Sequence, residues 1–237
     1  MKNSILIVLS VLFLLNIYAL SAQETKNKQV RLGLNISPNL SWMKPGSGDY
    51  SSEGSIIGFS YGIMSEFSLT DNYFIATGIH ITTTGGKFKY DDRRNVNSVP
   101  TDINLTRKYK LRYIEIPLLL KMKTRQIGAF SYFGAFGLGT SFNIFANADD
   151  EFIYSDNTGI HQESENDNDI GSKINFLKES LIIGGGVEYS LGGSTSIVLS
   201  ILYNNGFTDI LSGSNNLTSK KEKASSRLIE LNIGVIF

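Results

Sequence analysis

The two histidines, His80 and His161, are the side chains best suited to general-base chemistry, because an unperturbed imidazole titrates near neutral pH. A serine hydrolase would also need a nucleophile on a sharp turn, and no G-x-S-x-G segment accompanies either histidine. The chain contains no cysteine, which excludes a catalytic thiol, a thiolate zinc site and a disulfide. We therefore expect His80 to be structural and predict no catalytic residue.

An acidic segment at residues 147–175 surrounds His161. Carboxylates at this density could bind Ca²⁺ or bridge through divalent cations to anionic lipid. Their spacing does not match an EF-hand, so we favour a solvated loop and predict no metal site. Glycine-rich stretches (IIGGGVEY and LGGSTS) lack the Lys-Ser/Thr pair of a phosphate loop, and we expect no cofactor. The carboxylates of the acidic segment are Asp149, Asp150, Glu151, Asp156, Glu163, Glu165, Asp167 and Asp169.

The overall charge is balanced, with 22 Lys plus Arg against 22 Asp plus Glu. This neutrality argues against a nucleic-acid partner, which would require a basic surface. Glycine is abundant (23 residues), proline is scarce (4), and there are 14 Phe and 11 Tyr. Such a composition indicates an aromatic-rich β protein in which backbones approach one another closely.

The first 22 residues have the features of a signal peptide. Lys2 gives a positive start, residues 5–15 (ILIVLSVLFLL) are an apolar run, and small residues precede the expected cleavage site after Ala22. The alternative is a membrane anchor, but the run is shorter than the ~20 residues of a spanning helix. We therefore expect a cleaved segment at 1–22, a mature domain at 23–237, and no transmembrane helix in that domain.

Beyond Gln23 the dominant hydrophobic period is two, which is the period of a β-strand. The clearest cases are residues 57–69 and 229–237, in which apolar side chains alternate with small or polar ones. The connections between such segments are alternately short (TDN, TRQIG, GGS) and long and polar. Eight segments can be counted, at 28–42, 54–69, 73–90, 107–123, 129–146, 176–191, 195–207 and 226–237.

Alternating short and long connections are typical of an up-and-down barrel in an outer membrane, with short periplasmic turns and long extracellular loops. The alternative is a soluble sandwich or lipocalin-like barrel, in which the apolar face would point inward. The second face is rich in Gly, Ser, Ala and Asn, which suit the narrow lumen of eight strands. We therefore predict an all-β fold, an eight-stranded antiparallel transmembrane β-barrel.

Charged residues recur on the small-residue face of the predicted strands, and His80 shares their parity. Buried charges require partners, so we expect one structural ion-pair network that links the strands inside the lumen. Basic segments at 107–112 and 219–223 would lie near the outer rim, where they could meet lipid phosphates or remain solvated. The predicted network consists of Arg31, Glu66, Glu115, Lys121, Glu188 and Glu230.

The stretch RYIEIPLLLKMK at 112–123 resembles the Y-[LI]-E-[IL]-P-L-L-L-K signature of the PorT-like outer-membrane β-barrel family of the Bacteroidota. The early LGLNISPNLSW, the SAQ at the expected cleavage site and the final aromatic residue agree with this resemblance. It implies a small outer-membrane barrel, and a few members are implicated in protein secretion. Phe237 resembles the signal by which barrel-assembly machinery recognises its clients. Pro117 lacks a ladder donor, so we predict a bulge there.

We therefore expect a non-enzymatic outer-membrane protein, structural or accessory to secretion or envelope assembly, because side chains fill the lumen of eight strands. Its expected partners are outer-membrane lipid and lipopolysaccharide, the assembly machinery, and secretion or envelope proteins. Two alternatives stay open. One is a small porin or solute-binding barrel, and the other is a lipid-modifying enzyme that uses His80 or His161.

Overall fold

The computed structural model describes residues 30–46, 48–96 and 98–237. The expected signal peptide at 1–22 lies outside these ranges. Within them, no helix combines the length and the apolar character needed to cross a membrane. The elements of the described residues are β-strands together with a short 3-10 helix, η2 (Gly171–Lys173).

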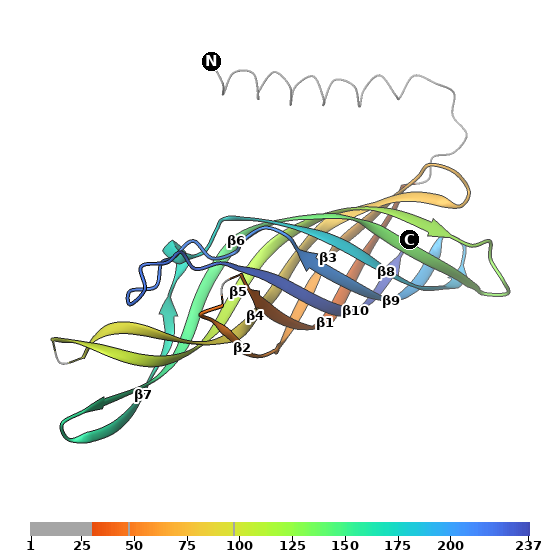
Figure 1. Ribbon diagram of the computed structural model, residues 1–237. Coiled ribbons are helices and arrows are strands. Elements are labelled where there is room, and N and C mark those ends of the chain that lie inside the picture. The colour runs from red at the N-terminus through yellow and green to blue at the C-terminus, as the bar shows by residue number, and fades with distance from the viewer. Residues whose placement is uncertain (1–29, 47, 97) are drawn as a thin grey trace, which may run out of the picture.

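Eight antiparallel strands of the described residues close into a ring (Figure 1). Closure occurs at β1, where Leu34 lies opposite Ile63 of β3 on one side and Val235 of β10 on the other. This confirms the predicted eight-stranded antiparallel barrel. In order around the ring the strands are β1 (Val30–Pro45), β3 (Ile56–Ser68), β4 (Tyr73–Val96), β5 (Val99–Lys123), β6 (Phe130–Asp156), β8 (Leu177–Gly192), β9 (Thr195–Gly206) and β10 (Ala224–Ile236).

The barrel wall is apolar outside and polar inside. On β1, Leu34 is 60% exposed, whereas its neighbour Asn35 is 7% exposed and faces the lumen. The Asn35 amide donates to Asn232 at 2.9 Å across the β1–β10 pair, so polar side chains of neighbouring strands hydrogen-bond inside the lumen. An apolar outer face suits lipid and would be unfavourable in water. The wall therefore excludes the soluble sandwich and the lipocalin-like barrel, both of which need apolar residues inside.

Short turns lie at one end of the barrel, here called the short-turn end. They comprise residues 69–72, 124–129 and 193–194. The last of them requires glycine, because Gly192 and Gly193 have φ angles of 103° and 62°, at which a side chain is strained. The C-terminus also lies at this end of the barrel (Figure 1).

At the opposite end β4, β5 and β6 continue beyond the other strands and form an extension (Figure 1). Its inward face is mostly apolar, unlike that of the lumen, and buries Phe88, Leu105 and Tyr109 in one cluster. The extension therefore has a hydrophobic core of its own. Two further strands flank the ring: β2 (Ser51–Gly54) pairs with β4, and β7 (Gly159–Asp169) pairs with β6.

Two segments predicted to be loops are in fact largely strands. Residues 91–106 form most of the outer hairpin between β4 and β5, and residues 147–175 include the end of β6 and all of β7. The prediction was wrong because the outer face of these strands is polar, so the hydrophobic alternation along them is weak. Arg93, for example, pairs with Asp102 directly across the hairpin at 2.6 Å. Opposite charges on facing strands stabilise a ladder in which apolar alternation is weak.

The predicted bulge at Pro117 is also wrong. β5 keeps one register with β4 on both sides of this residue, and its ladder with β6 continues through it. The missing N–H is tolerated because the ladder to β4 is interrupted there, and the Thr77 hydroxyl donates to the Pro117 carbonyl at 2.7 Å. The bulge of β5 lies instead between Arg112 and Tyr113, in its ladder with β6.

Candidate functional site

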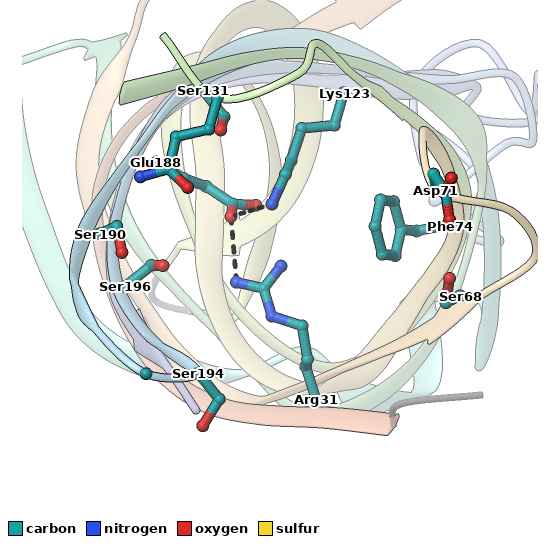
Figure 2. Close-up of a pocket in the computed structure, with 12 residues that line it drawn as sticks. Arg31, Ser68, Asp71, Phe74, Lys123, Ser131, Glu188, Ser190, Ser194 and Ser196 are labelled. Carbon is teal, nitrogen blue, oxygen red and sulfur yellow. Dashed lines mark hydrogen bonds and ion pairs between the residues drawn. The ribbon is translucent and has the colours of Figure 1, made fainter. Parts of the chain in front are cut away.

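Five charged side chains meet inside the barrel near the short-turn end, and we call them the mouth cluster. Arg31 lies at the start of β1, Glu66 near the end of β3, Lys121 and Lys123 at the end of β5, and Glu188 on β8. Lys121 Nζ lies 2.5 Å from Glu66 Oε1 and 2.5 Å from Glu188 Oε1. The Arg31 guanidinium contacts the same two carboxylates at 3.1 and 3.0 Å. Lys123 Nζ lies 2.8 Å from Glu188 Oε2 (Figure 2).

The ion pairs of the mouth cluster cross the lumen. β8 is not a ladder neighbour of β1, β3 or β5, so the contacts of Glu188 with Arg31 and Lys121 cross the barrel interior. Glu66, Lys121 and Glu188 are all buried. Buried charges are tolerated only when they are paired and hydrogen-bonded, and every member of the cluster has at least one partner. The result is a plug made of side chains that the strands position from different sides.

A predominantly polar pocket of about 350 Å³ opens at the short-turn end, with members of the mouth cluster as its floor. Figure 2 shows Arg31, Lys123 and Glu188 at its centre. Arg31 and Lys123 keep 11% and 19% of their side chains exposed, while Lys121 beneath them keeps 4%. The walls of the pocket include Ser131, Ser190, Ser194, Ser196, Asp71 and Phe74.

A second charged group lies deeper in the lumen, around Glu115. Its Oε2 accepts hydrogen bonds from the Ser141 hydroxyl at 3.1 Å and the Asn204 amide at 3.0 Å. Lys178 Nζ lies 3.7 Å from the same oxygen. Glu230 is buried as well, but among the described residues it makes no ion pair. The lumen is therefore filled at a second height.

The single predicted network thus consists of two separate groups. Four of the six predicted residues meet in the mouth cluster, whereas Glu115 belongs to the deeper group and Glu230 lies near that group without an ion pair. The reason is height: Glu115 precedes Lys121 by about 20 Å along β5, at the usual rise of a strand. Sequence reasoning missed Lys123 and Lys178. Both lie an even number of residues from lumen-facing residues of their strands and therefore face the lumen as well.

The two histidines lie far apart in the sequence and in different settings. His80 lies opposite Glu115 across the β4–β5 ladder and lines a lumen cavity. His161 lies on β7, where its Nε2 contacts both Thr158 Oγ1 at 2.8 Å and Asp156 Oδ1 at 3.0 Å. Hydrogen bonds from Thr158, and then from His161, lower the pKa of Asp156 to about 2. A catalytic triad uses opposite ring nitrogens for hydroxyl and carboxylate, so this contact is not a triad.

The acidic segment at 147–175 is partly neutralised by basic residues of β4 and β5. Buried Asp150 accepts hydrogen bonds from Arg107 at 2.6 and 2.7 Å and also contacts Arg94. Burial opposes ionisation, but Arg107 and Arg94 together hold the pKa of Asp150 below its usual value. Arg107 therefore faces the extension core and not lipid phosphates. No group of three or more His, Asp or Glu in the described part of the chain could hold a metal ion.

Several solved structures resemble the chain. Neisserial surface protein A is 13% identical, with 87% of this chain and 95% of that chain covered and a TM-score of 0.42. OprG from Pseudomonas aeruginosa is 12% identical, with 89% and 97% covered and a TM-score of 0.46. The N-terminal barrel domain of OprF from the same organism is 12% identical, with 89% and 100% covered and a TM-score of 0.35. No curated protein matches the chain.

A family model provides the assignment. The model described as "Outer membrane protein beta-barrel domain" matches residues 21–212, which is most of the sequence. That range includes seven of the eight ring strands, from β1 to β9. It also includes every member of the two charged groups of the lumen. The chain therefore belongs to the family of outer membrane protein beta-barrel domains and is an outer-membrane protein.

Proposed function

We propose that this protein is a non-enzymatic, non-conducting outer-membrane barrel whose role is structural or accessory to secretion or envelope assembly. The observation that carries the proposal is the mouth cluster, whose ion pairs cross the lumen. The group around Glu115 and Lys178 fills the lumen at a second height. Since eight strands enclose a space just wide enough for side chains, the barrel has no room for a wide aqueous path.

The extension supports the accessory role. Its core, which includes Phe88, Leu105 and Tyr109, makes it an ordered body with a defined surface. A preorganised surface loses less conformational entropy when a partner binds. We place the extension at the cell surface and the short turns in the periplasm, with outer-membrane lipid and lipopolysaccharide around them. Within the family, the motif at 112–123 favours affiliation with the PorT-like barrels of the Bacteroidota.

Assembly follows the usual route for such proteins in this proposal. The segment at 1–22 directs export to the periplasm, and the barrel-assembly machinery then recognises the last strand with Phe237 at its end. Phe237 exchanges backbone hydrogen bonds of 2.9 and 2.8 Å with Leu32 of β1. It therefore also contributes to the seam at which the barrel closes.

Planar-bilayer recording tests the closed lumen. The wild-type protein should show no large stable conductance, whereas a variant that lacks the ion pairs of both lumen groups should conduct, because serine side chains are too short to cross the lumen. A matched control is Arg93→Ser/Asp102→Ser, which removes an ion pair outside the barrel. Each preparation should first show the heat-dependent gel shift of a folded barrel. Large stable conductance of the wild type would favour a small porin instead. The lumen variant replaces Glu66, Glu115, Lys121, Lys178 and Glu188 by serine.

Crosslinking in intact envelopes tests the accessory role. The comparison is between the wild type and a variant in which residues 93–102 of the outer hairpin are replaced by a two-residue turn. A partner crosslinked by the wild type alone supports an accessory function, and identical crosslinking by both supports a structural one. A change in lipid A upon gene deletion that His80→Ala or His161→Ala reproduces would contradict the non-enzymatic assignment.

A further inference from the structure

The charges of the mouth cluster do not balance. Within the described residues it contains three cations and two carboxylates, a net charge of +1 at neutral pH. Asp71 also lines the pocket, but it lies on an exposed turn across from Glu188, where water screens it (Figure 2). An unbalanced charge in a largely buried cluster is unfavourable, and a counter-ion relieves it.

The unbalanced charge is presented to the pocket. Arg31 and Lys123 are the two cations with exposed side-chain surface, and both line the cavity. Two N–H groups of Arg31 and one of Lys123 donate to Glu66 and Glu188. A guanidinium has five donors and an ammonium has three, so both side chains have donors left. A ligand can therefore be bound without dismantling the plug.

One wall of the pocket supplies neutral donors. Ser131 of β6, Ser190 of β8 and Ser196 of β9 line the cavity on the side of Glu188 (Figure 2). Guanidinium, ammonium and hydroxyl donors gathered around one cavity are suited to carboxylate and phosphate oxygens. A volume of about 350 Å³ holds such a group together with further atoms of a polar ligand.

We propose that the pocket at the short-turn end is a binding site for a monoanionic group, a carboxylate or a phosphate, carried by a small polar ligand. Arg31 and Lys123 hold the anion, and the serine hydroxyls bind polar atoms next to it. The bound anion neutralises the mouth cluster. The binding of the anion requires only the pocket. That the ligand stays at this mouth and does not pass through the barrel rests on the proposed function.

Titration calorimetry of the refolded barrel in detergent micelles tests the site. Acetate and inorganic phosphate are probes for a free anion, and N-acetylglycylglycine is a probe for a carboxylate at a chain end. N-acetylglycylglycinamide has the same chain without the charge. Saturable binding of at least one anionic probe is expected, with an affinity that falls as salt is raised. The amide should not bind.

Two substitutions change the net charge of the cluster in opposite directions. Lys123→Gln lowers it to zero and should weaken anion binding about tenfold, the usual worth of a hydrogen bond to a charged group. Glu66→Gln raises it to +2 and should tighten binding. Lys220→Gln is the matched control, because Lys220 pairs with Asp49 at 2.7 Å in the loops of the opposite end. It should leave the affinity unchanged.

Equal affinity for the acid and the amide would overturn the proposal, and so would equal affinity of the wild type and Lys123→Gln. Bilayer recordings on the same preparations separate the two proposals. A closed barrel that does not bind anions refutes the anion site and leaves the closed lumen standing. A conducting barrel that binds them refutes the closed lumen and leaves the anion site standing.

Discussion

Replacement of Lys121 by methionine should destabilise the barrel by about 3–5 kcal/mol. The Lys121 ammonium lies between Glu66 and Glu188 and 4.0 Å from the centre of the Phe133 ring. Methionine preserves most of the side-chain length but removes the charge. The variant therefore leaves two buried carboxylates without their shared cation.

The size of the destabilisation depends on the ion pairs that Glu66 and Glu188 retain in the variant. Breaking a buried ion pair costs about 3–5 kcal/mol, and both carboxylates retain Arg31, which favours the lower value. The lost cation–π contact with Phe133 adds up to about 2 kcal/mol, because the site is desolvated. Lys121→Met/Glu66→Leu should recover part of the loss, since it removes a buried carboxylate together with its cation. Replacing a whole buried pair by apolar residues is often close to neutral.

Urea unfolding in lipid vesicles, followed by the fluorescence of Trp42, measures these free energies. Trp42 is the only tryptophan and stacks on Tyr203 with ring centres 6.4 Å apart, so its emission reports separation of the strands. Lys110→Met is the control, because its ion pair with Asp149 is partly exposed and such pairs contribute about 0–1 kcal/mol. A loss below about 1 kcal/mol for Lys121→Met would refute the reasoning. A double variant less stable than the single one would also do so.

The extension should lose stability in acid. Asp150 has a lowered pKa when folded, so its stabilising effect is complete above about pH 4 and is lost as the pH falls through the folded-state value. Hydrogen-exchange protection of residues 91–106 should fall in that range, and Asp150→Asn should reduce this pH dependence. Thr77→Val should cost about 1 kcal/mol by removing the bond to Pro117, and Thr77→Ser should not. Deletion of Phe237 should reduce the heat-modifiable barrel in membranes more than any single loop substitution does, and wild-type levels would contradict this.

Strand parity could be predicted from the sequence, because the side-chain period of a strand is two and one face of the barrel meets lipid. It placed Glu115, Pro117 and Lys121 on one face of β5, and all three are buried. Parity carries no information on height along the barrel axis, which depends on the stagger between neighbouring strands. For this reason a single network was predicted, although Glu115 and Glu66 belong to different groups.

The extension was missed for a different reason. Hydrophobic alternation identifies strands whose outer face meets lipid, but outside the membrane the outer face meets water. Ile103 and Leu105 are buried on the inner face of β5, while the residues around them are polar and resemble a loop. The charge pair between Arg93 and Asp102 is recognisable only once the register of the hairpin is known.

A reversal of inner-face chemistry along β5 marks where lipid gives way to water. Lys121 and Glu115 face inward in the barrel, and Tyr109 and Leu105 face inward in the extension, all with the same parity. Where lipid covers the outer face, the apolar side chains of the strands are shielded from water by lipid. The interior is then free to hold charges. Where water covers it, the interior must supply a hydrophobic core. The change occurs near Tyr113, where β5 also has its bulge, so this part of the strand marks the boundary between the lipid-covered wall and the extension.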